Sequence, residues 1–192
     1  MFIEAIFVGL VIVFLTNGRF DNFSEVEIKG WPMIVAGVIL ELSVIFFSRY
    51  TFSLYLQLTG MMTVMLAVAM NLRIRGFLLM FLGGLLNLMA VLLNNLRMPV
   101  NLVGGKTSSM TSFMDTVLEG DVINYMVDSA GGWTALLGKI MTTPIWYPFP
   151  RLLSVGDLVI TLGILFFIVG ESKRKHFHRE STMVQYSYRN RI

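Results

Sequence analysis

Five apolar stretches separated by charged clusters are the feature that most limits how this chain can fold. Each stretch is close to the ~20 residues that a helix needs to cross the hydrocarbon core of a membrane. Backbone N–H and C=O groups in lipid must find partners within their own segment, so runs of this length form helices rather than strands. The sequence therefore predicts an all-α fold, a polytopic membrane helix bundle with about five transmembrane helices. The stretches cover residues 2–16, 32–48, 51–71, 76–96 and 152–170.

The composition agrees with a membrane protein and excludes several kinds of chemistry. Of the 192 residues, 55% are hydrophobic and 14% are charged, whereas an average soluble domain has about 25% charged residues. The chain has no cysteine, and both histidines, His176 and His178, fall in the polar C-terminal segment. No P-loop, zinc-protease or serine-hydrolase motif is found. We therefore expect no metal, no cofactor and no catalytic site, with carboxylate chemistry as the one catalytic alternative.

The distribution of basic residues predicts an orientation. Residues 171–192 carry six lysines and arginines, and the positive-inside rule places such a segment in the cytoplasm. Five spans then put the N-terminus outside. The prediction is a single transmembrane domain, residues 1–170, in the cell (inner) membrane, followed by a basic cytoplasmic tail, residues 171–192. We expect this tail to contact anionic lipid rather than nucleic acid, because no recognition module accompanies it.

The long segment 97–151 lies on the outer side in this topology. Apolar residues recur at i, i+3, i+4, i+7 and i+8 in residues 110–118 and again in residues 133–141. This spacing is typical of amphipathic helices, and both are too short to span a membrane. We expect two interfacial or re-entrant helices that form a lid over the bundle.

A carboxylate within an apolar stretch is a candidate functional group. Glu41 lies near the middle of residues 32–48, and a charge there costs about 2.5–3.5 kcal/mol on insertion scales. It is either a proton- or cation-responsive site or a protonated carboxyl that is hydrogen-bonded to a neighbour. Asn87, near the middle of residues 76–96, is the expected partner, although a role in helix packing also explains this asparagine.

A second polar group is expected toward the outer side of the bundle. Glu4 begins the first stretch, Asn94 and Arg97 end the fourth, and Asp157 enters the fifth. These side chains could form a small polar pocket beneath the lid. Its simplest content is an Arg97–Asp157 ion pair. The alternative is a ligand headgroup bound by Arg97, with Asp157 holding the arginine in place.

Glycines in the last stretch suggest close helix packing. Gly156, Gly163 and Gly170 recur every seven residues and therefore lie on one stripe of a helix. Small residues on one stripe allow another helix to approach closely. That helix belongs either to the same bundle, where Gly83 and Gly84 offer a facing surface, or to a second copy of the chain.

Several short motifs together resemble a known family. They are Asn17-Gly18-Arg19, residues 95–100 (NLRMPV) and residues 149–157 (FPRLLSVGD). They resemble an uncharacterised family of short bacterial integral membrane proteins that is common in clostridia and their relatives. The resemblance covers most of residues 1–170. It implies a membrane protein without implying an activity, and it adds weight to Arg97, Pro99 and Asp157 as residues to test.

Two functions are compatible with these features. The first is binding, or assistance in transport, of a small molecule, ion or lipid headgroup beneath the outer lid. The second is a non-catalytic subunit or scaffold of a larger or homo-oligomeric membrane complex. The expected partners are accordingly membrane lipid, a small-molecule ligand, and a second copy or larger complex. The candidate ligand-binding residues are Glu4, Glu41, Asn87, Asn94, Arg97 and Asp157.

Overall fold

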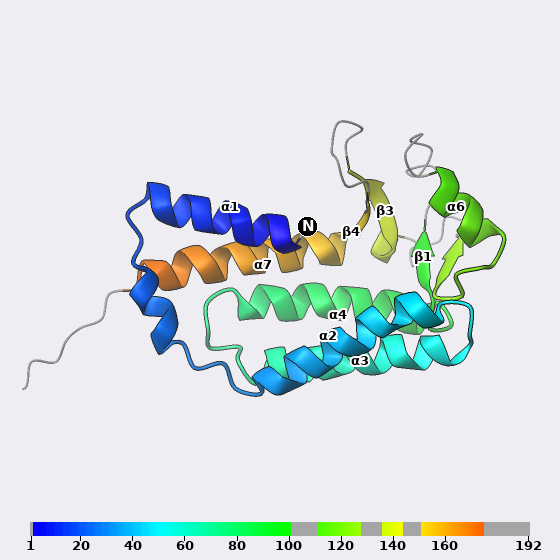
Figure 1. Cartoon of the computed structure of the whole chain (residues 1–192), viewed down its shortest axis with the longest axis horizontal. Helices are drawn as coiled ribbons and strands as arrows, with labels where there is room; N and C mark the ends of the chain where they lie inside the picture. Colours follow the sequence, from blue (N-terminus) through cyan, green and yellow to red (C-terminus); the bar gives the residue numbers. More distant parts are fainter. Residues whose placement is uncertain (1, 101–110, 128–135, 144–150, 175–192) are drawn as a thin grey trace, which may run out of the picture.

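The computed structural model describes residues 2–100, 111–127, 136–143 and 151–174. In these ranges the chain is mostly helical, and its long helices lie side by side along one axis (Figure 1). Short connections reverse the chain between α2 and α3 and between α3 and α4. The long helices are α1 (Phe2–Leu15), α2 (Trp31–Phe47), α3 (Phe52–Ala69), α4 (Phe77–Leu93) and α7 (Val155–Ser172).

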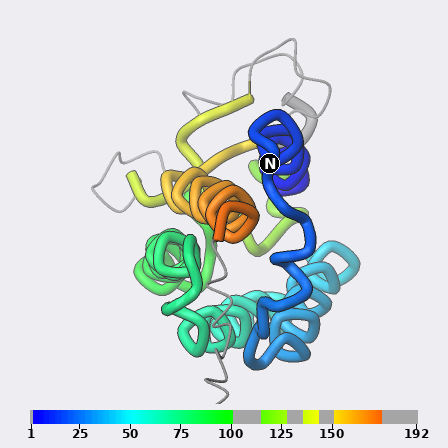
Figure 2. Tube along the Cα trace, turned by 90° about the vertical axis from the view of Figure 1, so that its left-hand side faces the viewer, coloured from blue at the N-terminus to red at the C-terminus, as the bar shows by residue number. Residues whose placement is uncertain are grey.

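The long helices form an open arc. Neighbours in the arc are α2 and α3, α3 and α4, α4 and α7, and α7 and α1. Figure 2 looks along the helices and shows α1 and α2 at the two ends of this arc. A short 3-10 helix, η1 (Phe20–Glu25), packs on α7 at the end of the bundle where α7 stops. We call this the tail end.

A small sheet and a short helix cover the opposite end of the bundle. The strands are β1 (Met98–Val100), β2 (Tyr125–Val127), β3 (Lys139–Thr142) and β4 (Leu152–Ser154), in the order β2-β1-β3-β4. β1 is parallel to both β2 and β3, whereas β3 and β4 are antiparallel. The helix is α6 (Thr111–Leu118). We call these strands and α6 the cap, and this end of the bundle the cap end.

The cap corrects part of the predicted fold. The chain is not all-α, and residues 139–141 form strand β3 instead of the end of an amphipathic helix. Short apolar runs do not distinguish a helix from a strand by periodicity alone, and here pairing with β1 and β4 decides. Trp133 lies outside the described residues. The other predicted amphipathic helix is present as α6, although Met110 also lies outside the described residues.

The boundaries of two predicted helices also change at the cap. The fourth ends at Leu93 instead of residue 96, because Asn95 and Leu96 have left-handed backbones with φ of 54° and 63°. The last begins at Val155 instead of residue 152, because Leu152–Ser154 pairs as β4. Both changes turn residues expected within the bundle into parts of the cap.

The long helices expose much of their apolar surface. Two of them, α3 and α7, are long and apolar enough to cross a membrane, yet only 28% of the residues in each are buried within the protein. Phe14 is 76% exposed and Phe46 is 81% exposed. Helices α1, α2 and α4 are also apolar but shorter than 18 residues. The buried residues instead follow the lines where helices meet, and include Ala5, Val13, Ala67, Ala90 and Val91.

Candidate functional site

The first turn of α7 is held by a capping box. The hydroxyl of Ser154, the residue before the helix, accepts a hydrogen bond from the backbone N–H of Asp157 at 3.0 Å. The Asp157 carboxylate in turn accepts one from the backbone N–H of Ser154 at 3.1 Å. This reciprocal pair satisfies N–H groups that a helix start otherwise leaves without partners. Asp157 therefore has a structural role before any ligand is considered.

Two more side chains complete the surroundings of Asp157. Asn87 of α4 donates to one carboxylate oxygen of Asp157 at 2.9 Å and accepts a hydrogen bond from the Ser154 hydroxyl at 2.6 Å. The ammonium group of Lys139 in β3 lies 3.0 Å from the other carboxylate oxygen. The side chains of Lys139 and Asp157 are 19% and 13% exposed. We call these four residues, Asn87, Lys139, Ser154 and Asp157, the anchor network.

The anchor network differs from the predicted arrangement. Asp157 pairs with Lys139 and not with Arg97. Asn87 bonds to Asp157 and Ser154 and not to Glu41. Lys139 was not among the predicted site residues. The amphipathic helix that we predicted over residues 133–141 would place this lysine on its exposed polar face. Its place in a strand beside β4 brings it to the start of α7.

Glu41 lies near the anchor network without joining it. Its side chain packs across Gly60 of α3, where an added β-carbon would lie 2.9 Å from Glu41 Cγ. The charges of Asp157 and Lys139 are close enough to interact electrostatically with Glu41. Within the part of the chain that the structure describes, Glu41 has no direct hydrogen bond or ion pair with them. Its side chain is exposed on α2.

Two other predicted site residues, Glu4 and Asn94, contact partners outside the anchor network. The Glu4 carboxylate lies 3.5 Å from the guanidinium of Arg151, which precedes β4. The side chain of Asn94 donates to the carbonyl of Ala90, one turn earlier in α4, at 2.7 Å. Neither residue is brought to Asp157 in the structure. The predicted group therefore separates into several contacts at the cap end.

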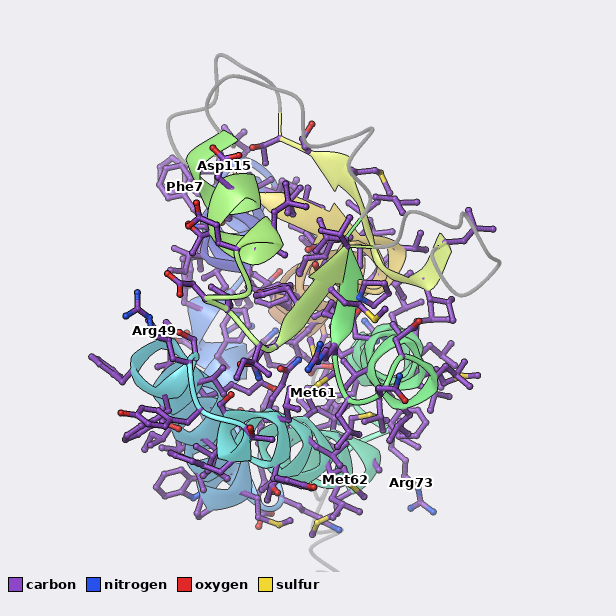
Figure 3. All side chains as sticks on the ribbon, turned by 90° about the vertical axis from the view of Figure 1, so that its right-hand side faces the viewer. Phe7, Arg49, Met61, Met62, Arg73 and Asp115 are labelled. Atoms are coloured by element: carbon purple, nitrogen blue, oxygen red, sulfur yellow. The ribbon has the colours of Figure 1, made fainter. Side chains whose placement is uncertain are left out.

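Arg97 lies elsewhere, at a pocket in the cap. The pocket has a volume of about 390 Å³ and lies between Arg97, which precedes β1, the end of helix α6 and strand β2 with the segment that leads into it. Figure 3 views the molecule from the cap end, with α6, which carries Asp115, above the helices. Among the described residues that line the pocket, Arg97 is the one with a charge. The others are Val117, Leu118, Gly120, Val122, Ile123, Tyr125, Met126 and Val127.

A buried asparagine fastens one wall of this pocket to the bundle. Asn124 is 1% exposed and directly precedes β2. Its side chain accepts a hydrogen bond from Ser53 at 2.8 Å and donates to Gln57 at 2.7 Å, both in α3. Its backbone carbonyl accepts from Met98 of β1 at 2.8 Å. The pocket wall is thus attached to a long helix, and no sequence pattern had identified Asn124.

The glycine stripe of α7 faces α4 in the same chain. A β-carbon on Gly156 would collide with the carboxamide oxygen of Asn87 and lie 2.6 Å from the carbonyl of Gly83. One on Gly163 would lie 2.8 Å from the carbonyl of Gly76, whereas Gly170 faces the side chain of Arg75. Gly76 and Gly83 are also seven residues apart, so the two antiparallel helices match glycine to glycine. Sequence analysis did not use Gly76, whose spacing from Gly83 would have indicated this pairing of the two helices.

The fold and the cap define a mostly helical protein with two candidate membrane-spanning helices and a small sheet at one end. A family of unknown function, DUF5317, matches residues 25–169. The chain belongs to this family, which confirms the prediction of an uncharacterised family. The match begins within η1 and continues through α2 to α7, so it leaves out α1. No curated protein and no solved structure matches the chain.

Proposed function

We propose that this protein is a multi-pass membrane protein that binds a small molecule in the cap pocket at the outer face of the cell membrane. The helix bundle anchors the cap, and the pocket holds the ligand, either for binding alone or as a step in transport. The observation that carries the proposal is the pocket itself. Its volume falls within the range of about 300–1,000 Å³ that is usual for small-molecule sites, and the described residues that line it are mostly apolar, with Arg97 as the charged one.

The exposed apolar surface supports a membrane location. Soluble monomers rarely expose contiguous apolar patches larger than a few hundred Å², whereas large apolar side chains are exposed on each of the long helices, for example Phe14 on α1, Phe46 on α2 and Phe166 on α7. The long helices have 14 to 18 residues, or about 21–27 Å at 1.5 Å per residue. This is slightly shorter than a typical hydrocarbon core, and local thinning of the bilayer compensates for such differences at modest cost. Long helices that follow one another in the chain run in opposite directions between the cap end and the tail end (Figure 1), which favours five passes.

The basic residues support an orientation with the cap outside. Arg73 and Arg75 lie between α3 and α4 at the tail end, and Lys173 and Arg174 follow α7 there. Arg19 also lies at this end, where its backbone N–H donates to Ser172. The positive-inside rule then places the tail end in the cytoplasm. The N-terminus is outside in this proposal.

The scaffold alternative has lost one of its three supports. The scarcity of polar groups and the lack of a catalytic motif still favour it, but the glycine stripe packs on α4 of the same chain at Gly156 and Gly163. Assembly with a second copy or with other proteins stays a prediction from the sequence.

The test compares ligand retention in a pocket variant and a matched control. Native mass spectrometry of the protein, released gently from its own membrane, is expected to show a bound small molecule. Met126→Trp fills the pocket and abolishes this signal, whereas Met62→Trp adds the same volume on an exposed face of α3 and preserves it (Figure 3). Absence of any bound molecule from the wild-type protein, or equal retention in both variants, would refute the proposal.

A further inference from the structure

The basic side chains at the cap end divide into paired and unpaired ones. Arg49 lies 2.9 Å from Asp121, Lys139 lies 3.0 Å from Asp157, and Arg151 lies 3.5 Å from Glu4. Across the described ranges of the chain, Arg97 is the exception at this end, because its guanidinium makes no ion pair. It is also exposed, at the pocket. Its charge is therefore available to a molecule that enters.

The turn before β1 places Arg97 at this position. Asn95 and Leu96 both have left-handed backbones, a conformation that residues other than glycine adopt rarely, and leucine more rarely than asparagine. The backbone N–H of Arg97 then donates to the carbonyl of Asn94 at 3.0 Å, and β1 begins at the next residue. This turn sends the chain from α4 into the sheet at the edge of the pocket.

The acidic residues of the cap that the structure describes do not neutralise this arginine. Asp115 and Glu119 are exposed and belong to α6 and its end, and neither lines the pocket. Asp121 is occupied by Arg49. Among its described residues, the pocket thus combines the guanidinium of Arg97 with mostly apolar walls from α6 and β2. A guanidinium presents a planar fork of N–H groups that matches a carboxylate or a phosphate in a two-point contact.

We infer that the cap pocket binds an amphiphile with one anionic headgroup, a carboxylate or a phosphate monoester, on an apolar body. Arg97 binds the headgroup, and the apolar walls bind the body. This inference rests on the proposed function and names the ligand class for the same pocket. The pocket lies beside the helices that we place in the membrane, so a single-chain membrane lipid is one source of this chemistry. A water-soluble organic acid is the other source.

The experiment measures binding of defined probes to the full-length protein in nanodiscs made only of a zwitterionic phospholipid. Dodecyl phosphate and dodecanoate carry the anion and the apolar chain, dodecanol carries the chain alone, and inorganic phosphate carries the anion alone. We expect both anionic probes to bind at least tenfold more tightly than dodecanol, as for a hydrogen bond to a charged group. Higher salt is expected to weaken the binding of both anionic probes, because salt screens the interaction of an exposed charge such as that of Arg97.

Substitutions assign the effect to Arg97. Arg97→Gln is expected to lower the affinity for dodecyl phosphate at least tenfold, and Arg97→Lys, which keeps the charge without the fork, to lower it less. The control Arg151→Gln removes the same charge at the other edge of the sheet, next to β4, and leaves the affinity within about twofold. Unchanged thermal unfolding of each variant shows that the protein has folded.

The outcomes separate this inference from the proposed function. Equal affinity for dodecanol and dodecyl phosphate, with no effect of Arg97→Gln, overturns the anionic ligand while leaving a small-molecule pocket. Equal affinity for inorganic phosphate and dodecyl phosphate overturns the amphiphile. Hexanoate, which carries the anion on a short chain, separates the two sources. If dodecanoate binds more tightly than hexanoate, the ligand is a membrane lipid rather than a water-soluble organic acid. If no probe binds and no endogenous molecule is retained, both proposals fail.

Discussion

The cap end of this protein uses charged side chains in two opposite ways. In the anchor network, each of Asn87, Lys139, Ser154 and Asp157 is bonded to another member. At the pocket, the guanidinium of Arg97 is exposed and has no acidic partner among the described residues. A closed network contributes to the stability of one arrangement, whereas an open charge is free to select a ligand. Substitutions in the two places should therefore differ in what they change.

The largest effect is expected at Asp157. Asp157→Ala leaves the largely buried ammonium of Lys139 without its partner and removes the cap of α7, so we expect a loss of about 3–5 kcal/mol of unfolding free energy. Thermal unfolding in detergent, followed by tryptophan fluorescence, measures the loss. The double variant Asp157→Leu with Lys139→Met removes both charges and should regain most of the stability. Equal destabilisation of single and double variants would show that the ion pair is unimportant.

The next effect is expected at the glycine contact that supports the network. In Gly83→Ala the new β-carbon would lie 2.5 Å from the carbonyl of Gly156 and 2.8 Å from the backbone nitrogen of Ile160. Backbone atoms cannot move aside easily, so we expect a loss near the upper end of about 1–3 kcal/mol. The adjacent Gly84→Ala is the control, because its β-carbon meets only Met65 at 3.4 Å. The same unfolding measurement applies, and equal effects would refute the packing.

A smaller loss is expected from the asparagine that joins α4 to the network. Asn87→Ala removes a bond to Asp157 and a bond from Ser154, each with a net value of about 1 kcal/mol. Asn94→Ala is the matched control at the residue that directly follows α4, since it loses a single bond, to the carbonyl of Ala90 in that helix. The unfolding midpoint should fall clearly more for Asn87→Ala. A larger fall for Asn94→Ala would contradict the anchoring role of Asn87.

The smallest effect on stability is expected at the pocket. Arg97→Gln removes an exposed side chain with no ion pair among the described residues, so the unfolding free energy should change by less than about 0.5 kcal/mol. The same variant should lose affinity for anionic amphiphiles, which Asp157→Leu with Lys139→Met should largely keep. A destabilised Arg97→Gln protein would remove the contrast between the two places.

The helices could be predicted from the sequence because their signal is local. Apolar runs, Pro32 near the start of α2 and the spacing of Gly156 and Gly163 all act within one helix or between two neighbouring helices. The family resemblance was likewise readable from short motifs. The single all-α class failed where local signals are weak, in strands of three or four residues.

The candidate site depended on contacts between distant segments. Lys139 reaches Asp157 only because β3 lies between β1 and β4, and nothing in residues 133–141 alone indicates a strand. The left-handed backbone of Leu96 is equally invisible, since leucine is not a residue that favours it. Asp157 was therefore identified as a candidate without its partner Lys139, and the ion pair predicted between Arg97 and Asp157 was wrong. Five passes, the orientation and the ligand stay proposals.

The arc of helices has a consequence for how the protein is made. The main neighbour of α1 is α7, and about 140 residues separate the end of α1 from the start of α7, so a ribosome working at 5–20 residues per second needs on the order of ten seconds to bridge them. In the proposed topology, α1 stays in the bilayer for that time without its final neighbour, while α2, α3 and α4 assemble beside it. The face of α1 that α7 covers in the finished fold, at Gly9 and Ile168, is then open to lipid during that interval.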